Sequence, residues 1–194
     1  VRYKRWGVAP SVTFGIGGPT SLTLSYLHQE DDNIPVYGVP YYPALGGLLP
    51  GAEYSGYYGY ANIDSQTQTV DQATVRFVHD FSDTTTLTAL GRWQRVEANT
   101  IVNPPQGTYC LASGVTQAGV ACGTGQVPGM YYPSGPRGTA RYAETQTLFG
   151  QVDLRTEFAT GPLAHTLVVG FCATQEDYVL RQGNVQRNAD GSSV

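Results

Sequence analysis

The sequence is poor in charge, methionine and long hydrophobic runs. Asp, Glu, Lys and Arg make up 13% of its 194 residues, and it contains a single Met. The formal net charge is -4, and this mild acidity gives no sign of nucleic-acid binding, which would need clustered Lys and Arg. No stretch approaches the roughly 18 consecutive apolar residues of a membrane-spanning helix. Any membrane-facing hydrophobicity must therefore be distributed over alternate positions.

Catalytic and cofactor motifs are also missing. No serine lies in the G-x-S-x-G frame of a nucleophile elbow. Residues 15–18, Gly-Ile-Gly-Gly, do not follow the strand-then-helix pattern of a phosphate-binding loop and are better explained as a turn. The three histidines are far apart in the sequence. We therefore expect neither an enzyme nor a bound metal or cofactor.

What the sequence does contain is a regular alternation of apolar and polar residues. It is clearest in residues 147–158, where one face of a β-strand would consist of Leu148, Val152, Leu154 and Phe158. The other face would consist of Phe149, Gln151, Asp153, Arg155 and Glu157. Successive side chains of a strand point to opposite faces. One face could thus meet hydrocarbon while the other meets water.

The alternation predicts an all-β chain with antiparallel strands at residues 5–14, 21–29, 67–81, 86–97, 143–158 and 165–178. Each is long enough to cross a bilayer at a tilt, which takes roughly 9 to 11 residues. Three connections are short, at residues 15–20, 82–85 and 159–164. The other two, at residues 30–66 and 98–142, run to roughly forty residues, far beyond a hairpin loop.

Long connections on one side and short turns on the other are typical of outer-membrane β-barrels. A soluble β-sandwich with one wet face produces similar alternation but has no reason to sort its loops. Six strands cannot close a membrane barrel. Nothing at Val1 resembles a signal peptide. We therefore expect residues 1–194 to be an internal piece of a longer barrel.

Several phrases resemble the barrel of TonB-dependent siderophore receptors, most closely the catecholate-receptor branch. They are RWGVAPSVTF at 5–14, LTLSYLHQ at 22–29, NIPVYGVP at 33–40, VRFVHDF at 75–81, LGRWQR at 90–95 and NADG at 188–191. The resemblance implies a barrel of about 22 strands in the outer membrane of a Gram-negative bacterium, plugged by an N-terminal domain. It further implies import of a ferric siderophore, driven by the TonB coupling protein through the plug. Neither the plug nor its coupling box is present in the sequence.

Aromatic and cationic loop residues are the candidate ligand contacts. The first long loop is rich in tyrosine, whose flat ring can stack on a catecholate while its hydroxyl bonds to a polar rim. We single out Tyr57, Tyr58 and Tyr60, although loop tyrosines also pack on one another or lie at the membrane interface. A ferric catecholate anion would favour cations, and Arg137 and Arg141 in the second long loop are available. The lumen arginines Arg76, Arg92 and Arg155 are expected to pair with acids across strands or with the plug.

Cys110 and Cys122 enclose part of the second long loop. In an oxidising extracytoplasmic compartment such a pair is expected to form a disulfide, with a stabilisation on the order of 3 kcal/mol. A zinc pair is the competing interpretation, but it would need more than two thiolates or a nearby histidine. Cys172 remains, and we expect it to be a small buried filler on the last strand.

Two other classes of protein stay open. A general or substrate-specific porin would share the barrel pattern, with an open, charge-ringed constriction in place of a plug. An extracellular β-sandwich or adhesin module would keep the cysteine loop and the tyrosines. Strand length, loop sorting and the receptor-like phrases favour the siderophore receptor.

Overall fold

The computed structural model of the chain describes residues 2–36, 38–42, 46–104, 109–116, 118–129 and 137–186. The NADG phrase at 188–191 lies outside these residues, as does the side chain of Arg137. All helices and strands assigned in the described part of the chain are β-strands. No helix long and apolar enough to cross a membrane occurs among these residues.

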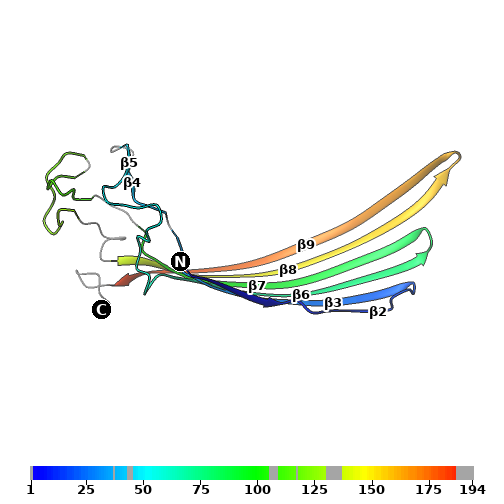
Figure 1. Ribbon diagram of the computed structural model, residues 1–194. Helices are drawn as coiled ribbons and strands as arrows, with labels where there is room; N and C mark the ends of the chain where they lie inside the picture. The colour runs from blue at the N-terminus through cyan, green and yellow to red at the C-terminus, as the bar shows by residue number, and fades with distance from the viewer. Residues whose placement is uncertain are drawn as a thin grey trace.

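The strands form one long curved sheet and one small hairpin (Figure 1). In chain order they are β1 (Tyr3–Val8), β2 (Ser11–Phe14), β3 (Thr20–Asn33), β4 (Tyr41–Tyr42), β5 (Gly47–Leu48), β6 (Ser65–Ser82), β7 (Thr85–Val102), β8 (Arg137–Thr160) and β9 (Leu163–Gln186). The large sheet has the order β1-β3-β6-β7-β8-β9, with β2 also paired to β3, and all pairs are antiparallel. The predicted antiparallel all-β fold is confirmed.

β1 and β2 together correspond to the single strand predicted at 5–14. The register is the same on both sides of the break, since Val8 pairs with His28 and Ser11 with Ser25. Pro10 lacks the N–H group that a sheet ladder needs, but its carbonyl still accepts a hydrogen bond from the Tyr26 N–H, 3.0 Å away. The break between β1 and β2 is therefore local, and it is explained by the missing N–H group of Pro10.

The connections are sorted as predicted (Figure 1). Short turns join β2 to β3, β6 to β7 and β8 to β9 at one end of the sheet, and the two long loops leave from the opposite end. Gly15 opens the first turn with φ of 74°, and a Cβ there would lie 2.0 Å from the Thr20 carbonyl oxygen. Gly161 opens the third with φ of 60°. Only glycine adopts such turns without strain or a clash.

The strands extend farther toward the long loops than the sequence predicted. β8 begins at Arg137 rather than at 143, β7 runs to Val102 rather than 97, and β9 continues to Gln186 rather than 178. The prediction was wrong there because it ended each strand where outward apolar residues end. Beyond that point the alternation becomes irregular, with Val179 and Leu180 on opposite faces of β9, yet the backbone ladder continues. Arg137 and Arg141 consequently lie on β8 and not in a loop.

Register places the apolar residues of neighbouring strands side by side on one face, which we call the outer face. Val75 lies opposite Gly91, Gly91 opposite Gly150, and Gly150 opposite Ala173. Its large apolar side chains are exposed in the described structure, among them Val12, Leu24, Val75, Trp93, Leu148, Val152, Leu154, Phe158 and Phe171. The opposite, inner face carries Gln151, Asp153 and Arg155. The predicted division into two faces holds across six strands.

The sheet is a single layer, since no second sheet or helix among the described residues packs on either face (Figure 1). A β-sandwich requires two sheets packed about 10 Å apart. The few buried side chains all lie at the loop end: Asp31, Pro35, Pro40, Asp64, Val102, Asn103, Tyr109, Cys110 and Thr116. The sandwich alternative therefore does not fit.

Candidate functional site

The two long loops meet at the end of the sheet and form what we call the loop lobe, described for residues 34–64 and 103–129 with the gaps given above. Its centre is a polar contact between the loops. Asp64, 5% exposed, closes the first loop just before β6, and Asn103, fully buried, opens the second just after β7. The Asn103 amide nitrogen donates a hydrogen bond to Asp64 Oδ1.

The tyrosines predicted as ligand contacts lie in this lobe and are half-buried. The Tyr57 hydroxyl donates to Asp64 Oδ2 at 2.7 Å, and the Tyr60 backbone N–H donates to the same oxygen at 3.1 Å. The Tyr58 hydroxyl donates to the Glu53 carbonyl oxygen at 3.1 Å. The hydroxyls of Tyr57 and Tyr58 thus hold their own loop together. A role for these three residues in binding remains a prediction.

Arg141 occupies a different position. It is exposed on β8, opposite Thr100 and Gln182, on the same face as Gln151 and Asp153. Its guanidinium has no hydrogen-bond or ion-pair partner within the described part of the chain. An unpaired cation on the inner face close to the loops is suited to an anionic ligand. The structure does not bring it into contact with the three tyrosines.

A second arginine at this end of the inner face is already engaged. Arg5 holds Asp31 through two hydrogen bonds, Nε to Oδ1 at 2.5 Å and an Nη2 contact to Oδ2 at 3.0 Å. Hydrogen bonding from Arg5 lowers the pKa of the Asp31 carboxyl, which is 5% exposed. This bidentate pair fastens β1 to β3. It leaves Arg5 less available to a ligand than Arg141.

The outer face carries a polar cluster just beyond the apolar residues, toward the loops. Arg95 Nε donates to Glu144 at 3.0 Å and Arg95 Nη2 donates to Glu97 at 2.7 Å. The Tyr142 hydroxyl donates to Glu144 at 2.8 Å, and the Arg181 guanidinium lies 5.7 Å from the Tyr142 ring centre. Hydrogen bonding, first from Arg95, lowers the pKa of Glu144 to about 2. This cluster could not be expected from the sequence, because its members are spread over β7, β8 and β9.

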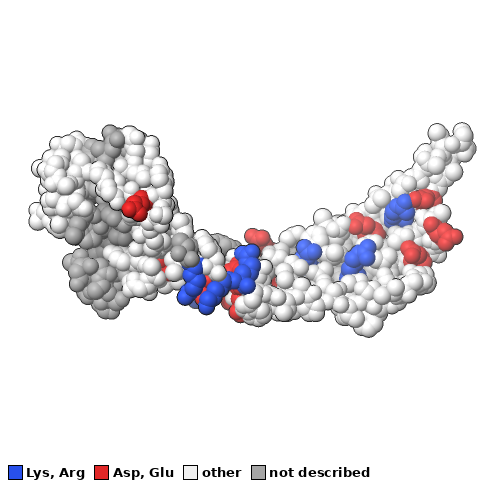
Figure 2. Space-filling view, in the orientation of Figure 1, with Lys and Arg blue, Asp and Glu red and all other residues white. Residues whose placement is uncertain are grey.

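The predicted cross-strand ion pairs of the lumen arginines are not found among the described residues, where Arg76 and Arg92 have no acidic partner. Arg155 pairs with Glu157, two residues along the same strand rather than across strands. Arg92 Nε donates to the Thr74 hydroxyl at 3.4 Å. Side chains two residues apart share a face, so the pairing within β8 needs no partner strand. Figure 2 shows Lys and Arg gathered where the N-terminal strand meets the loop end, with further charges along the sheet toward the short turns.

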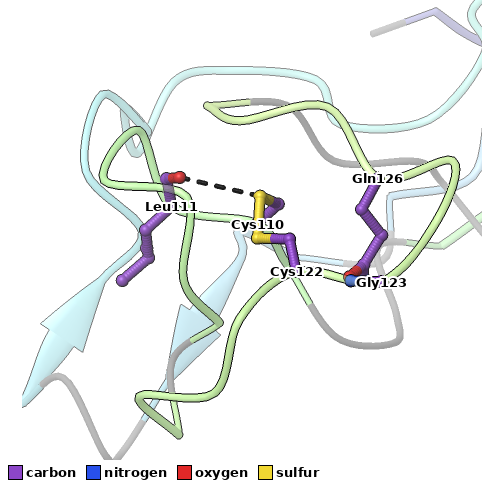
Figure 3. Close-up of a disulfide and its surroundings, with 5 residues drawn as sticks. All are labelled: Cys110, Leu111, Cys122, Gly123 and Gln126. Atoms are coloured by element: carbon purple, nitrogen blue, oxygen red, sulfur yellow. Dashed lines mark hydrogen bonds between the residues drawn. A yellow bond between two sulfur atoms is a disulfide. The ribbon is translucent and has the colours of Figure 1, made fainter.

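The predicted disulfide is present. Cys110 and Cys122 are bonded, with their Cα atoms 5.6 Å apart, and the Cys110 sulfur lies 3.7 Å from the Leu111 carbonyl oxygen (Figure 3). The loop between them is folded, since the Leu111 N–H donates to the Val115 carbonyl at 2.8 Å. The zinc alternative is wrong because the two thiols are bonded to each other. Cys172 is a free, exposed thiol on β9, so the expectation that it is buried is wrong, because no other element among the described residues covers either face of that strand.

Sequence reasoning missed Asp64 and Asn103, the most buried polar pair of the lobe. Asp64 immediately precedes a strand and Asn103 precedes a proline, and both patterns are common in loops. Nothing in the spacing of 39 residues indicates that the two side chains meet. No group of three or more His, Cys, Asp or Glu side chains in the described part of the chain could hold a metal ion.

No protein-family model matches the chain. It is 33% identical over 187 residues to the catecholate siderophore receptor Fiu of Escherichia coli O6:H1 (strain CFT073), covering 91% of this chain and 23% of that protein. It is 28% identical over 173 residues to the probable TonB-dependent siderophore receptor PiuA of Acinetobacter baumannii, covering 87% and 21%. The chain thus spans about a quarter of the length of these relatives.

Solved structures agree with the sequence matches. The open form of the ferric-catecholate import receptor Fiu from E. coli K12 superposes with a TM-score of 0.68 at 28% identity, over 91% of this chain and 27% of that one. The siderophore receptor PiuA gives a TM-score of 0.62 at 25% identity, over 91% and 24%. Over its matched length, the chain is homologous to TonB-dependent siderophore receptors and has the fold of a segment of their β-barrel.

Proposed function

We propose that the chain is part of an outer-membrane receptor that binds a ferric siderophore, of catecholate type, at its external loops and imports it. Residues 1–194 would belong to the barrel domain, with the remaining strands and the plug lying elsewhere in the full-length protein. Import would depend on the TonB coupling protein acting through that plug. The outer face of the sheet would contact membrane lipid and the inner face would line the lumen. No chemical conversion of the ligand is required.

One observation carries this proposal. A single-layer sheet with an apolar outer face and a polar inner face has all its short turns at one end, and at the other two long loops with a core of their own. Such a sheet is stable when lipid covers one face and the lumen contents the other. The similarity to catecholate receptors favours an anionic ferric ligand.

Arg141 offers the sharpest test of the ligand class. The full-length receptor in detergent can be titrated with a ferric catecholate complex while its tryptophan fluorescence is monitored. This titration should show saturable binding. Arg141→Gln should weaken it by about tenfold, the order expected for losing one charge-assisted hydrogen bond. Arg155→Gln is the matched control, because Arg155 lies on the same face of β8 but near the short turns and is paired with Glu157.

Two outcomes would contradict the proposal. Absence of saturable binding by the unchanged receptor would remove the catecholate ligand. Equal affinities of the Arg141 and Arg155 variants would remove Arg141 from the site.

A porin is the second candidate, and the similarity to siderophore receptors weighs against it. Ion conductance of the full-length protein in a planar bilayer without any coupling protein would favour the porin.

A further inference from the structure

We propose that Asp64 and Asn103 form a clamp that makes the two long loops a single unit, and that Asp64 is a positioning residue for the ligand site. The inference rests on the proposed function where it concerns the ligand. The coupling between the loops does not depend on it. Neither side chain needs to touch the ligand for this role.

The clamp lies at the point where both loops leave the sheet. Ser65 of β6 pairs with Ile101 of β7, so Asp64 and Asn103 stand directly beyond the last residues of two adjacent strands. The rigid ladder below them fixes their backbones. A contact between the two side chains therefore sets the direction in which both loops depart.

The Asp64 carboxylate is satisfied from both loops. Oδ1 accepts from the Asn103 amide, while Oδ2 accepts from the Tyr57 hydroxyl and from the Tyr60 backbone N–H. No ion pair to Asp64 is found among the described residues, so neutral donors alone stabilise a carboxylate that is 5% exposed. A buried charge of this kind tolerates little displacement of its donors. Moving either loop alone would break part of the set.

The backbone at Gly59 passes close to the Asp64 carboxylate. A Cβ on Gly59 would lie 2.2 Å from Asp64 Oδ2 and 2.9 Å from the Tyr57 hydroxyl. The chain thus passes close to the carboxylate through the one residue type without a side chain. Asn103 Oδ1 is buried and has no hydrogen-bond partner among the residues that the structure describes. The amide orientation is nevertheless fixed, because the nitrogen must face the Asp64 oxygen.

The orientation of the hydrogen-bond donors suggests a test of the clamp in which Asp64 and Asn103 exchange their residue types. In Asp64→Asn the new Oδ1 can still accept from Tyr57 and Tyr60, but its nitrogen faces the nitrogen of Asn103 unless the Asn103 amide turns over, which would leave the Asn103 nitrogen buried without an acceptor. In Asn103→Asp two carboxylates face each other. In the double variant Asp64→Asn/Asn103→Asp, the asparagine nitrogen again faces a carboxylate oxygen. Complementarity is lost in each single variant and restored in the double.

Hydrogen–deuterium exchange of the full-length receptor in detergent, without ligand, reads the coupling directly. Each single substitution should raise deuterium uptake in both loops, in peptides covering 46–63 and 109–129, including the loop that carries no change. The double variant should bring uptake in both loops back toward that of the unchanged receptor. Peptides from β6 and β7 and the heat-modifiability of the barrel should stay constant. Asp83→Asn, in an exposed short turn, is the matched control for charge removal.

Increased uptake confined to the substituted loop would overturn the clamp, as would a double variant no better protected than either single one. If a single variant fails to assemble, Asn103→Ala takes its place, with increased uptake in residues 46–63 as the decisive result. In the ligand arm, Asp64→Asn should weaken ferric catecholate binding by about tenfold and the double variant should recover it. Failure of the unchanged receptor to bind would refute the proposed function while leaving the exchange result intact.

Discussion

The sheet and the loop lobe of this chain are held together in different ways. The sheet has a continuous backbone ladder from β3 to β9, broken in register only by an irregularity between Asp80 and Ser82, and almost no buried side chain. The lobe has little regular structure but contains most of the buried residues and the disulfide. In one region the backbone provides the order, and in the other the side chains do.

This difference indicates what surrounds each region. A sheet open on both faces must obtain its favourable burial from outside the described chain, which on our proposal means lipid on the outer face and the plug on the inner face. On the same proposal the lobe faces water and must bury its own core. Substitutions should therefore act on the sheet according to which face they occupy, and on the lobe according to whether they reach its centre.

The largest effect is expected on the outer face. Val152→Arg in the full-length receptor would place a cation in the middle of the apolar face, at a cost of about 2–4 kcal/mol in a bilayer. We expect a lower yield of heat-modifiable protein in outer membranes. Gln151→Arg, one residue away on the inner face, is the control. Similar yields of the two variants would contradict the assignment of the faces.

The next largest effect is expected from removal of the disulfide, and this effect should be confined to the lobe. Replacing Cys110 and Cys122 by Ser should destabilise the loop by about 3 kcal/mol, because the enclosed segment regains chain entropy. Limited proteolysis should cut the variant faster within residues 109–129, with the barrel unaffected. Peptide mapping of the unreduced protein should find these cysteines linked and Cys172 free. Free thiols at both positions would refute the bond.

A smaller effect should separate two neighbouring tyrosines. Tyr57→Phe removes a donor from the buried Asp64 carboxylate and should cost about 1.5–3 kcal/mol of local stability. Tyr58→Phe removes two exposed bonds, one to the Glu53 carbonyl and one from the Glu53 N–H, both neutral, and each should cost about 0.5–1.5 kcal/mol at most. Rates of proteolysis of the lobe measure both. If Tyr58→Phe proved the more damaging, the lobe would not be centred on Asp64.

The smallest effect concerns pH and the polar cluster of the outer face. Because the pKa of Glu144 is lowered from 4.5 to about 2 in the folded protein, its contribution to stability is complete above about pH 4.5 and is lost as the pH falls toward 2. The urea midpoint of the receptor should decrease over that interval. Glu144→Gln should flatten the decrease. An identical pH dependence in both proteins would mean that other acids dominate.

Much of the sheet could be predicted from the sequence because its information is local. Alternation at Leu148, Val152 and Leu154 assigns a face without knowledge of any partner strand, and glycine-containing turns such as that at Gly15 mark where the chain reverses. Strand ends toward the loops could not be predicted. There the alternation of apolar and polar residues becomes irregular, and the ladder continues because neighbouring strands still pair, which a single strand does not reveal.

The lobe was predictable only where chemistry leaves few choices. Two cysteines in an oxidising compartment pair readily, so Cys110 and Cys122 were found. Asp64 and Asn103 were not, since either residue could lie in an ordinary solvated turn. Arg141 was selected for its charge, but its place on a strand emerged only from the register of β7 and β8. Contacts between distant segments carry no local signal.

The length of β8 has a consequence for where the ligand would bind relative to the membrane. From Leu148, near the edge of the apolar residues, the strand continues to Arg137, roughly 35 Å along its axis at about 3.3 Å per residue. Because the strands of membrane barrels are tilted by about 35–45°, the proposed function places the loops roughly 25–30 Å beyond the apolar edge of the sheet. A ligand bound by the loops would therefore be captured before it reaches the level of the lipid.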